Sequence, residues 1–267
     1  MSHPLVEAMH VTKEFELGGG AFGRVFARRR RRLLAVDDVS LAIHQGETLG
    51  LVGESGSGKS TLARLLLRLI RPTDGGVCFD GQDISGLGER ALRPLRRGMQ
   101  IIFQNPYASL NPRQSVRQIL SLPLRLHFKM TERERRDRLD ELLRQVGLSP
   151  DHAGRYPHQL SGGMRQRVAI ARALAVRPEF IICDEPVSAL DVSIQAQILA
   201  LLQRLQQEFH LTYLFISHDL AVVRQLADRI AVMQRGKVVE IGSAEQVIDR
   251  PQHPYTQMLL ASAPELP

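Results

Sequence analysis

The sequence predicts an α/β protein whose parallel sheet is built around one phosphate-binding loop. A short apolar run, Glu47–Val52, leads into the glycine-rich stretch Gly53–Thr61, and a leucine-rich run follows it. Strand-like and helix-like patterns alternate again in the second half of the chain, which is typical of a parallel sheet with helices on both faces. Between these parts, residues 105–160 are mostly helical in pattern. In such a fold we expect ligands at the carboxyl ends of the strands.

The composition is that of a globular protein with one large domain, or one domain that carries an insert. Of the 267 residues, 43% are apolar, but Trp is absent and aromatic residues are few, so aliphatic side chains must supply most of the core. No run of 18 apolar residues occurs, which predicts no membrane-spanning segment. Met1–Pro4 lacks the pattern of a secretion signal. Cys78 and Cys183 each lie in an apolar run, and we expect buried free thiols in a reducing compartment.

The net charge of +7 comes mostly from arginine, with dense groups at Arg28–Arg32, Arg93–Arg97 and Arg133–Arg138. A basic balance makes nucleic acid or anionic lipid conceivable partners. No zinc-finger spacing, aromatic RNA-binding motif or helix-turn-helix pattern accompanies these charges, so solvated faces are favoured and no nucleic-acid partner is expected. Arg28–Arg32 either faces anionic lipid headgroups or forms a solvated loop, and both interpretations stay open.

The chain before residue 105 reads as short strands around one helix. We expect strands at Leu5–Phe15, Leu34–Ile43, Glu47–Val52, Val77–Asp80 and Met99–Phe103, and a helix at Leu62–Ile70. Gly18–Gly20 and the arginine block form an irregular excursion between the first two strands. Short strands separated by turns predict an antiparallel patch beside the main sheet.

The region from residue 105 reads as a helical subdomain inserted into the core. Ser115 to about Gly147 is helical in pattern, Thr131 and Glu134 form a capping box, and Gly147 ends the helix. The predicted domains are therefore a core of residues 1–104 and 161–250, an insert of residues 105–160 and a tail of residues 251–267.

Strands and helices alternate after the insert. We expect helices from Met164 to Val176, after Asp191 as the capping residue, at Ala244–Asp249 and at Tyr255–Ala261, and strands at Phe180–Cys183, Tyr213–Ile216, Ile230–Met233 and Val238–Ile241.

The glycine-rich stretch fits the phosphate-binding pattern G-x-x-x-x-G-K-[ST], and it follows a strand and precedes a helix as that pattern requires. Its members are Gly53, Glu54, Ser55, Gly56, Ser57, Gly58, Lys59, Ser60 and Thr61. The glycines let backbone N–H groups approach the phosphates. Lys59 is expected to reach the β- and γ-phosphates of a nucleotide, and the Ser60 hydroxyl to bind Mg²⁺.

An acid pair, Asp184 and Glu185, directly follows the apolar strand Phe180–Cys183. An Asp at such a place holds Mg²⁺ through its waters, and an adjacent Glu can polarise an attacking water. The alternative is a surface acid pair, which four preceding apolar residues and the following Pro186 disfavour. His218 follows a later strand, and it is a candidate, in addition to Lys59, for contact with the γ-phosphate.

Six motifs in this order resemble the ATP-binding subunit of ATP-binding-cassette (ABC) transporters. Besides the phosphate loop and the acid pair, Leu160–Arg167 is similar to the family signature Leu-Ser-Gly-Gly-Gln. Gln104 corresponds to the family's glutamine loop, and Ser188–Asp191 corresponds to its D-loop. His218 corresponds to the switch histidine. The resemblance implies a mixed core sheet with an antiparallel patch and an inserted helical subdomain.

The resemblance also implies roles for individual residues. Glu185 and His218 are expected to be catalytic, and Gln104 to contact the nucleotide and its Mg²⁺ together with Ser60 and Asp184. The aromatic ring of Phe15 is expected to stack on adenine. Ser161, Gly162 and Gly163 are expected to bind the γ-phosphate of an ATP held by a neighbouring subunit. Met164 departs from the usual Gln, which puts the fine geometry across that interface in doubt.

Within the family, the tail His253–Thr256 is similar to that of dipeptide, oligopeptide and nickel importers. This likeness implies a head-to-tail pair of ATP-binding subunits, two transmembrane permease subunits and an extracytoplasmic solute-binding protein. In that arrangement ATP binding closes the pair and hydrolysis resets the membrane subunits, with the chain at the cytoplasmic face of the inner membrane. No Cys follows Cys183, so we expect no iron–sulfur cluster in the tail.

Two other functions are alternatives to the importer. One is a soluble ABC ATPase that acts on nucleic acid or ribosomes, for which the +7 charge is the only indication. Salt-sensitive nucleic-acid binding would favour it, whereas co-purification with two membrane proteins would favour the importer. The other is a regulatory partner with a degenerate site, which the intact Lys59, Glu185 and His218 argue against.

Overall fold

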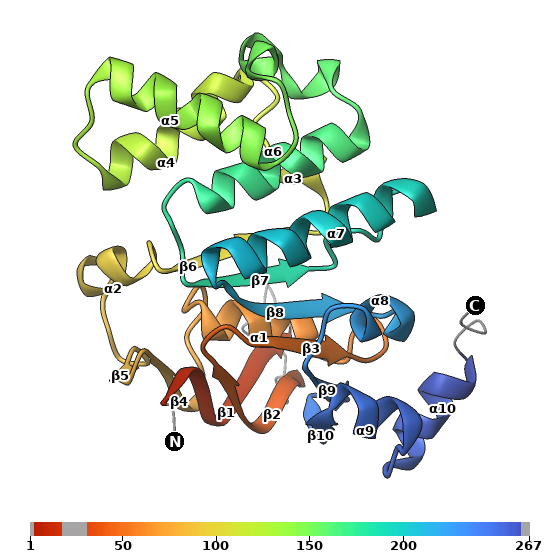
Figure 1. Cartoon of the computed structure of the whole chain (residues 1–267). Coiled ribbons are helices and arrows are strands. Elements are labelled where there is room, and N and C mark those ends of the chain that lie inside the picture. Colours follow the sequence, from red (N-terminus) through yellow and green to blue (C-terminus); the bar gives the residue numbers. More distant parts are fainter. Residues whose placement is uncertain (1–2, 18–30, 263–267) are drawn as a thin grey trace. The chain divides into compact units, whose positions relative to one another are not determined.

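The computed structural model describes residues 3–17 and 31–262, which form two compact units (Figure 1). The first unit comprises Met1–His44, Leu49–Leu87 and His218–Pro267, and the second comprises Gln45–Thr48 and Gly88–Ser217. Gly18–Gly20 and Arg28–Arg30, for which the sequence suggests an irregular excursion, lie outside the described residues. The domain boundaries proposed from the sequence stay a prediction.

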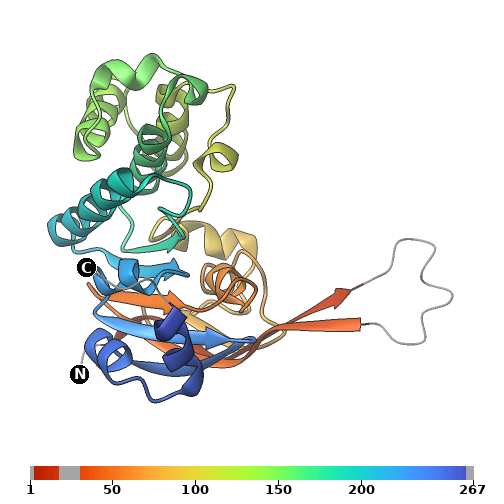
Figure 2. The ribbon, with the colours of Figure 1, turned by 90° about the vertical axis from the view of Figure 1, so that its right-hand side faces the viewer.

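The first unit contains a four-stranded antiparallel sheet in the order β2-β1-β4-β5. Its strands are β1 (Pro4–Leu17), β2 (Arg31–His44), β4 (Asp74–Phe79) and β5 (Gln82–Asp83). In β2, alternate residues such as Val39, Leu41 and Ile43 are buried, because successive side chains of a strand point to opposite faces. Figure 2 shows β1 and β2 as a long two-stranded ribbon. The predicted antiparallel patch is confirmed.

The same unit holds the strand that leads into the phosphate loop. From Leu49 onward, β3 (Thr48–Val52) pairs in parallel with β9 (Arg229–Gln234), and β9 pairs antiparallel with β10 (Lys237–Ser243). The helices of this unit are α1 (Lys59–Leu66), α8 (Leu220–Arg224), α9 (Ala244–Asp249) and α10 (Pro254–Ser262). The apolar side of α1 packs against β1 and β2, which places the helix beside the antiparallel sheet.

The second unit contains three parallel strands in the order β8-β7-β6. These strands are β6 (Met99–Ile102), β7 (Phe180–Asp184) and β8 (Thr212–Ser217). In β7 and β8 nearly every residue is buried, as in parallel sheets whose two faces are both covered. Consecutive apolar residues therefore marked these strands in the sequence.

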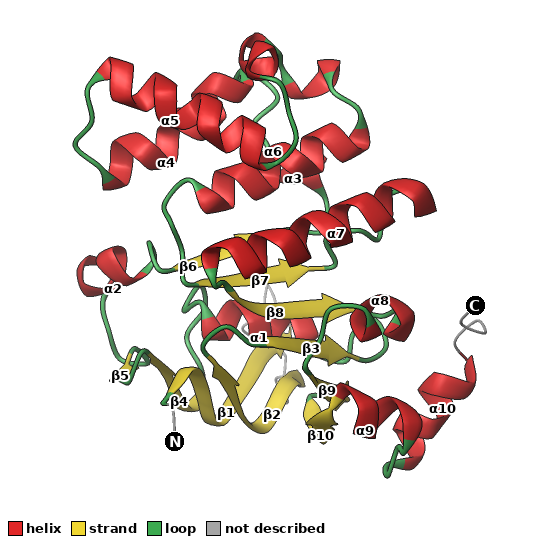
Figure 3. Cartoon of the chain, in the orientation of Figure 1, coloured by secondary structure: helices red, strands yellow, loops and turns green. Residues whose placement is uncertain are grey.

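Helices make up most of the rest of the second unit (Figure 3). They are α2 (Glu89–Leu95), α3 (Pro106–Ser109), α4 (Val116–His127), α5 (Glu132–Gln145), α6 (Gly162–Leu174) and α7 (Val192–Phe209), with 3₁₀ turns at Pro150–Gly154 and Pro157–Gln159. The three helices α3, α4 and α5 all pack against α6, so the helix that follows the signature is the centre of this cluster.

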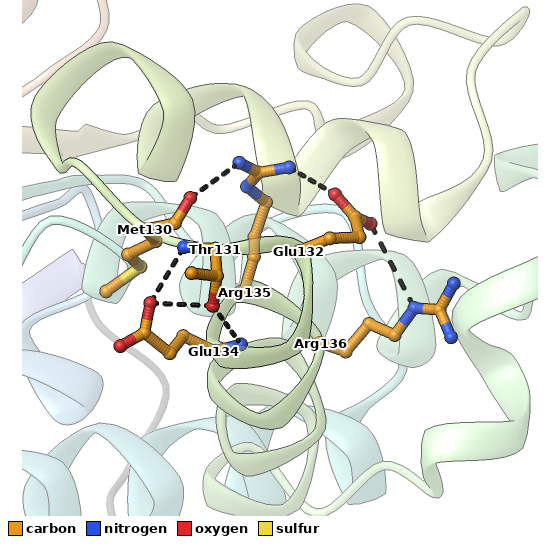
Figure 4. Close-up of polar contacts among 6 residues, drawn as sticks. All are labelled: Met130, Thr131, Glu132, Glu134, Arg135 and Arg136. Carbon is orange, nitrogen blue, oxygen red and sulfur yellow. Dashed lines mark hydrogen bonds and ion pairs between the residues drawn. The ribbon is translucent and has the colours of Figure 1, made fainter.

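Local signals located the start of α5 correctly, and Figure 4 shows its contacts. The Thr131 hydroxyl accepts a hydrogen bond from the Glu134 N–H (3.3 Å), and the Glu134 carboxylate accepts from the Thr131 N–H (2.7 Å). The predicted capping box is confirmed. Asp191 occupies the cap of α7 as predicted, but its side chain makes no capping hydrogen bond.

Other expectations about the helices were wrong. The helix after the phosphate loop ends at Leu66 rather than Ile70, because Arg68 takes a left-handed conformation (φ 50°) and buries its guanidinium against the carbonyl oxygens of Ile84 and Leu87. The stretch from Ser115 to Gly147 is two helices, since Phe128 is extended between α4 and α5. The sequence did not indicate α2, α3 or α8.

Both cysteines are free thiols. Cys183 is fully buried in β7, as expected, whereas Cys78 in β4 is only half-buried, because it lies on the less covered side of an antiparallel sheet. Among the described helices, none combines the length and apolar character that crossing a bilayer requires.

Candidate functional site

The phosphate loop joins β3 to α1 at the carboxyl end of β3, within the first unit. Gly53 and Gly58 have positive φ angles of 149° and 110°. A Cβ atom on Gly53 would lie 2.1 Å from the Met233 carbonyl oxygen, and one on Gly58 would lie 2.3 Å from the Ala35 carbonyl oxygen. Both positions therefore require glycine for conformation and for space.

Gly56 has a different environment in the same loop. Its φ of 81° is also left-handed, but a Cβ atom there would meet no atom within 4 Å. The space beside Gly56 is open, as a loop that admits a bound group needs. Ser57 is buried, and its hydroxyl makes no hydrogen bond to any described residue. A buried hydroxyl without a protein partner is uncommon, because most buried polar atoms in proteins are hydrogen-bonded.

Lys59 is buried, although it carries a charge. Its ammonium group donates hydrogen bonds to the carbonyl oxygens of Gly53 (2.6 Å) and Glu54 (2.8 Å). These bonds keep the cation folded over the loop, where it can meet an anionic ligand. Ser60 and Thr61 lie in the first turn of α1, whose N-cap is Gly58. The N-terminus of that helix, which favours anions, therefore directly follows the loop.

Two further predicted residues lie in the first unit. Phe15 is in β1 with 37% of its surface exposed, and the Lys13 ammonium lies 5.2 Å from the centre of its ring. His218 is exposed and follows β8. The neighbouring Asp219 caps α8 by accepting a hydrogen bond from the Ala221 N–H (2.8 Å), which gives it a structural task.

The second unit brings Gln104 and Glu185 together, just beyond the carboxyl ends of β6 and β7. The Gln104 side-chain amide donates a hydrogen bond to the Glu185 carboxylate (2.9 Å). Glu185 has a left-handed backbone (φ 47°), and its N–H donates to the Ile216 carbonyl oxygen (3.0 Å). A non-glycine residue in this conformation is strained, and such strain often occurs at functional sites. Asp184, the last residue of β7, is half-buried beside it.

The predicted magnesium ligands are a hydroxyl, an amide and a carboxylate, those of Ser60, Gln104 and Asp184. Oxygen donors of this kind suit Mg²⁺, which usually keeps several waters and takes few protein ligands besides the phosphates of its nucleotide. No group of three or more His, Cys, Asp or Glu side chains able to hold a metal occurs among the described residues. The hydroxyl, amide and carboxylate donors fit a metal that arrives with a nucleotide.

The signature segment forms the N-terminus of α6 in the second unit. Ser161 is the N-cap, and its hydroxyl accepts a hydrogen bond from the Met164 N–H (3.3 Å). A Cβ atom on Gly163 would lie 2.7 Å from a methyl carbon of Ile194 in α7. Gly163 therefore lets α6 pack closely on α7, a requirement that the sequence pattern did not show. Gly162 is less crowded, with its nearest contact at 3.4 Å.

Arg165 holds the signature segment in place, and the sequence analysis did not single it out. Its buried guanidinium donates to the carbonyl oxygens of Pro157 (2.7 Å) and Leu160, and its central carbon lies 3.6 Å from the ring centre of Tyr107 in α3. Burial lowers the pKa of Arg165. One cation thus joins the segment after Gln104 to the start of the signature.

A cavity of about 370 Å³ lies elsewhere in the second unit. Arg138, Phe209 and Leu211 are among its lining residues, and Leu211 directly precedes β8. None of the predicted site residues lines it, so the nucleotide hypothesis does not depend on this cavity.

Two models of known protein families match different parts of the chain. The family model described as ABC transporter matches residues 36–188, more than half of the chain. A second model, described as the C-terminal region of oligopeptide/dipeptide transporters, matches residues 239–267.

Among curated proteins, the chain is 53% identical over 261 residues to the oligopeptide transport ATP-binding protein AppF of Bacillus subtilis, covering 97% of this chain and 78% of AppF. It is 51% identical to OppF of the same organism, covering 99% of this chain and 84% of OppF. It is also 50% identical to the glutathione import ATP-binding protein GsiA of Pectobacterium atrosepticum, covering 98% of this chain but 42% of GsiA.

Solved structures show the same similarity. A post-hydrolysis dimer of the ATP-binding cassette MJ0796, bound to ADP and Pi, matches with a TM-score of 0.78 and 34% identity, covering 90% of this chain and 98% of that one. The cbiO1 structure from Clostridium perfringens matches with a TM-score of 0.77 and 27% identity, covering 92% of this chain and 91% of that one. The α/β fold expected from the sequence is thereby confirmed.

Proposed function

Because the chain belongs to the ABC transporter family, we propose that it is the ATP-hydrolysing subunit of an importer for oligopeptides or related peptides. The C-terminal region model and the oligopeptide and glutathione import relatives support this substrate class. Nickel or another small solute is the second choice of substrate, because the printed names of these relatives refer to peptides and glutathione. The names of these relatives all refer to peptide or glutathione transport, which supports the importer and not the nucleic-acid alternative.

In this function the loop Gly53–Thr61 cradles the phosphates of ATP, and Lys59 contacts the β- and γ-phosphates. Ser60, Gln104 and Asp184 hold the Mg²⁺, which neutralises charge on the phosphates when bound. The folded-back Lys59, the open space beside Gly56 and the oxygen donors support these roles. Phe15, with its exposed ring in β1, stacks on the adenine.

The observation that carries the proposal is the conformation of Glu185. Its carboxylate stands at the end of a buried strand on a strained residue and accepts a hydrogen bond from Gln104. Glu185 polarises the attacking water, and Gln104 links that carboxylate to the segment that follows β6. His218 contacts the γ-phosphate during the reaction.

The signature residues Ser161, Gly162 and Gly163 act on ATP held by a second subunit. Ser161 stands exposed at the start of the 13-residue helix α6, where backbone N–H groups favour an anion. A head-to-tail pair of subunits, identical or different, gives this segment its ligand, and the dimeric MJ0796 cassette is consistent with such pairing.

Two permease subunits are the membrane partners, and a solute-binding protein outside the membrane delivers the peptide to them. The chain itself is a peripheral subunit at the cytoplasmic face of the inner membrane. Residues 105–113, which contain α3 and the exposed Tyr107, form the surface that receives a permease segment. ATP binding closes the pair of ATP-binding subunits, and hydrolysis lets it reopen.

Two substitutions test this proposal. Glu185→Gln should lower the ATP turnover rate by about 10²–10⁴-fold, because it removes a general base, while ATP still binds. Glu179→Gln, at the exposed residue just before β7, is the matched control and should hydrolyse ATP normally. Lys59→Ala should abolish measurable ATP binding, whereas Lys129→Ala, an exposed lysine in the second unit, should not. Wild-type turnover by Glu185→Gln would contradict the catalytic assignment.

A further inference from the structure

The C-terminal tail makes a direct contact with the phosphate loop. The backbone N–H of Glu54 donates a hydrogen bond to the Tyr255 hydroxyl (3.0 Å), and the two residues are 201 positions apart in the sequence. Both belong to the first unit. Tyr255 lies in the first turn of α10 and only 5% of its surface is exposed, so the ring has little freedom to turn away.

A carboxylate on β10 anchors the turn that carries Tyr255. The Glu240 side chain accepts hydrogen bonds from the backbone N–H groups of Gln252 (2.8 Å) and His253 (3.0 Å). Burial, the largest single influence, raises the pKa of Glu240, but the polar groups around the carboxylate together lower the net pKa, so the carboxylate stays ionised near neutral pH. The Tyr255 N–H then donates to the His253 ring nitrogen Nδ1 (3.1 Å).

On the loop side, Glu54 is the residue that also holds the lysine. Its carbonyl oxygen accepts hydrogen bonds from the Lys59 ammonium (2.8 Å) and from the Ser57 N–H (3.1 Å). The N–H of Glu54 is thus bound by Tyr255 of the tail, and its carbonyl oxygen binds the Lys59 ammonium, which is expected to contact the phosphates. A shift of Glu54 would move the acceptor of Lys59.

We propose that Tyr255 is a positioning residue for the phosphate loop, through which the tail sets the affinity for ATP. The proposal rests on the function assigned above to Gly53–Thr61. In this role Tyr255 does not contact the nucleotide. It holds the Glu54 backbone in the position where the Glu54 carbonyl oxygen accepts the hydrogen bond from Lys59. The path runs from Glu240 through the turn at His253 to Tyr255, and then to Glu54. The tail therefore has a task in the nucleotide site of the same chain.

Tyr255→Phe tests the proposal, because it removes one oxygen atom and leaves the buried ring. Losing one hydrogen bond should raise the Kd for MgATP by about threefold to tenfold, measured by isothermal titration with the full chain. Tyr213→Phe is the matched control, since Tyr213 is also buried and donates its hydroxyl hydrogen bond to a backbone carbonyl, that of Leu202 (3.1 Å), in the second unit. It should lower the thermal midpoint without changing the Kd.

Glu240→Gln provides a second variant on the same path. It should weaken MgATP binding in the wild-type background but add little to Tyr255→Phe, because both changes act through one hydroxyl. Fully additive effects would overturn the path through Glu240. An unchanged Kd in Tyr255→Phe, alongside lost binding in Lys59→Ala, would overturn the proposal while leaving the nucleotide site intact. Retained binding in Lys59→Ala would instead contradict the assigned site itself.

Discussion

At the scale of single residues, the three glycines of the phosphate loop look alike in sequence but differ in structure. All three have positive φ angles, as the pattern G-x-x-x-x-G-K-[ST] predicts for its glycines. Only at Gly53 and Gly58 does a backbone carbonyl from another strand fill the place of a Cβ atom. Because those carbonyls come from distant parts of the chain, the local pattern carries no sign of them.

Alanine substitutions should separate these two requirements. Gly56→Ala should cost about 1–2 kcal/mol in the free energy of unfolding, which is the strain of a left-handed alanine. Gly58→Ala should cost at least about 3 kcal/mol, because overpacking against the Ala35 carbonyl oxygen adds to that strain. Chemical denaturation of both variants measures the difference. Equal costs would show that the Ala35 carbonyl moves aside without penalty.

At the scale of elements, helix starts were the most predictable features because the groups that form them are close in sequence. Two capping boxes open helices of the second unit, Thr131 with Glu134 at α5 and Ser115 with Gln118 at α4. They share one geometry but differ in charge. Hydrogen bonds from the backbone N–H and then the hydroxyl of Thr131 lower the pKa of Glu134.

The charge difference predicts a difference in pH dependence. Since the folded-state pKa of Glu134 lies below its usual value of 4.5, its contribution to stability is fully present above that value and is lost as the pH falls through the folded-state pKa. Glu134→Ala should therefore lower the thermal midpoint at pH 7 and have less effect at pH 3.

Gln118→Ala is the control for this experiment. The Gln118 side chain accepts the Ser115 N–H (2.8 Å) with a neutral amide, so the effect of its removal should not change across the same pH range. A pH-independent effect of Glu134→Ala would show that the carboxylate charge does not contribute to the cap.

Helix ends and contacts between helices were less predictable. The early end of α1 depends on Arg68, whose guanidinium finds its carbonyl partners 16 and 19 residues later in the chain. The stack of Arg165 on Tyr107 likewise joins two elements far apart in sequence. Such contacts form only after the chain has folded back on itself, and no short pattern announces them.

At the scale of the whole molecule, the residues proposed to act on ATP are divided between the units: the phosphate loop belongs to the first and the acid pair to the second. Each unit contains one of the two cysteines, Cys78 in the first and Cys183 in the second, so the reactivity of each thiol measures the opening of its own unit. Burial, and then the Asp184 carboxylate, raises the pKa of the Cys183 thiol. Cys183 should therefore react with a thiol reagent only when its unit opens.

Nucleotide should protect Cys183 if the proposed site is shared. In a chain carrying Cys78→Ser and Glu185→Gln, MgATP at 100 times its Kd should slow labelling of Cys183 by up to about 100-fold under mildly denaturing conditions. The same chain with Lys59→Ala is the control and should show no protection. An unchanged Cys183 rate with bound MgATP would indicate that the second unit takes no part in holding the nucleotide.

The sequence by itself determined the α/β class, most strands, the capping box of α5 and the strand–loop–helix pattern around Gly53–Thr61, because each is specified by residues within a few positions of one another. The loop glycines, Lys59 and the acid pair after β7 belong to such local patterns. Only the tertiary structure decided why Gly58 and Gly163 must lack side chains, where α1 ends, and that Tyr255 lies against Glu54. Those features depend on atoms brought together across tens to hundreds of residues, and packing and hydrogen bonding between such atoms exist only in the folded chain.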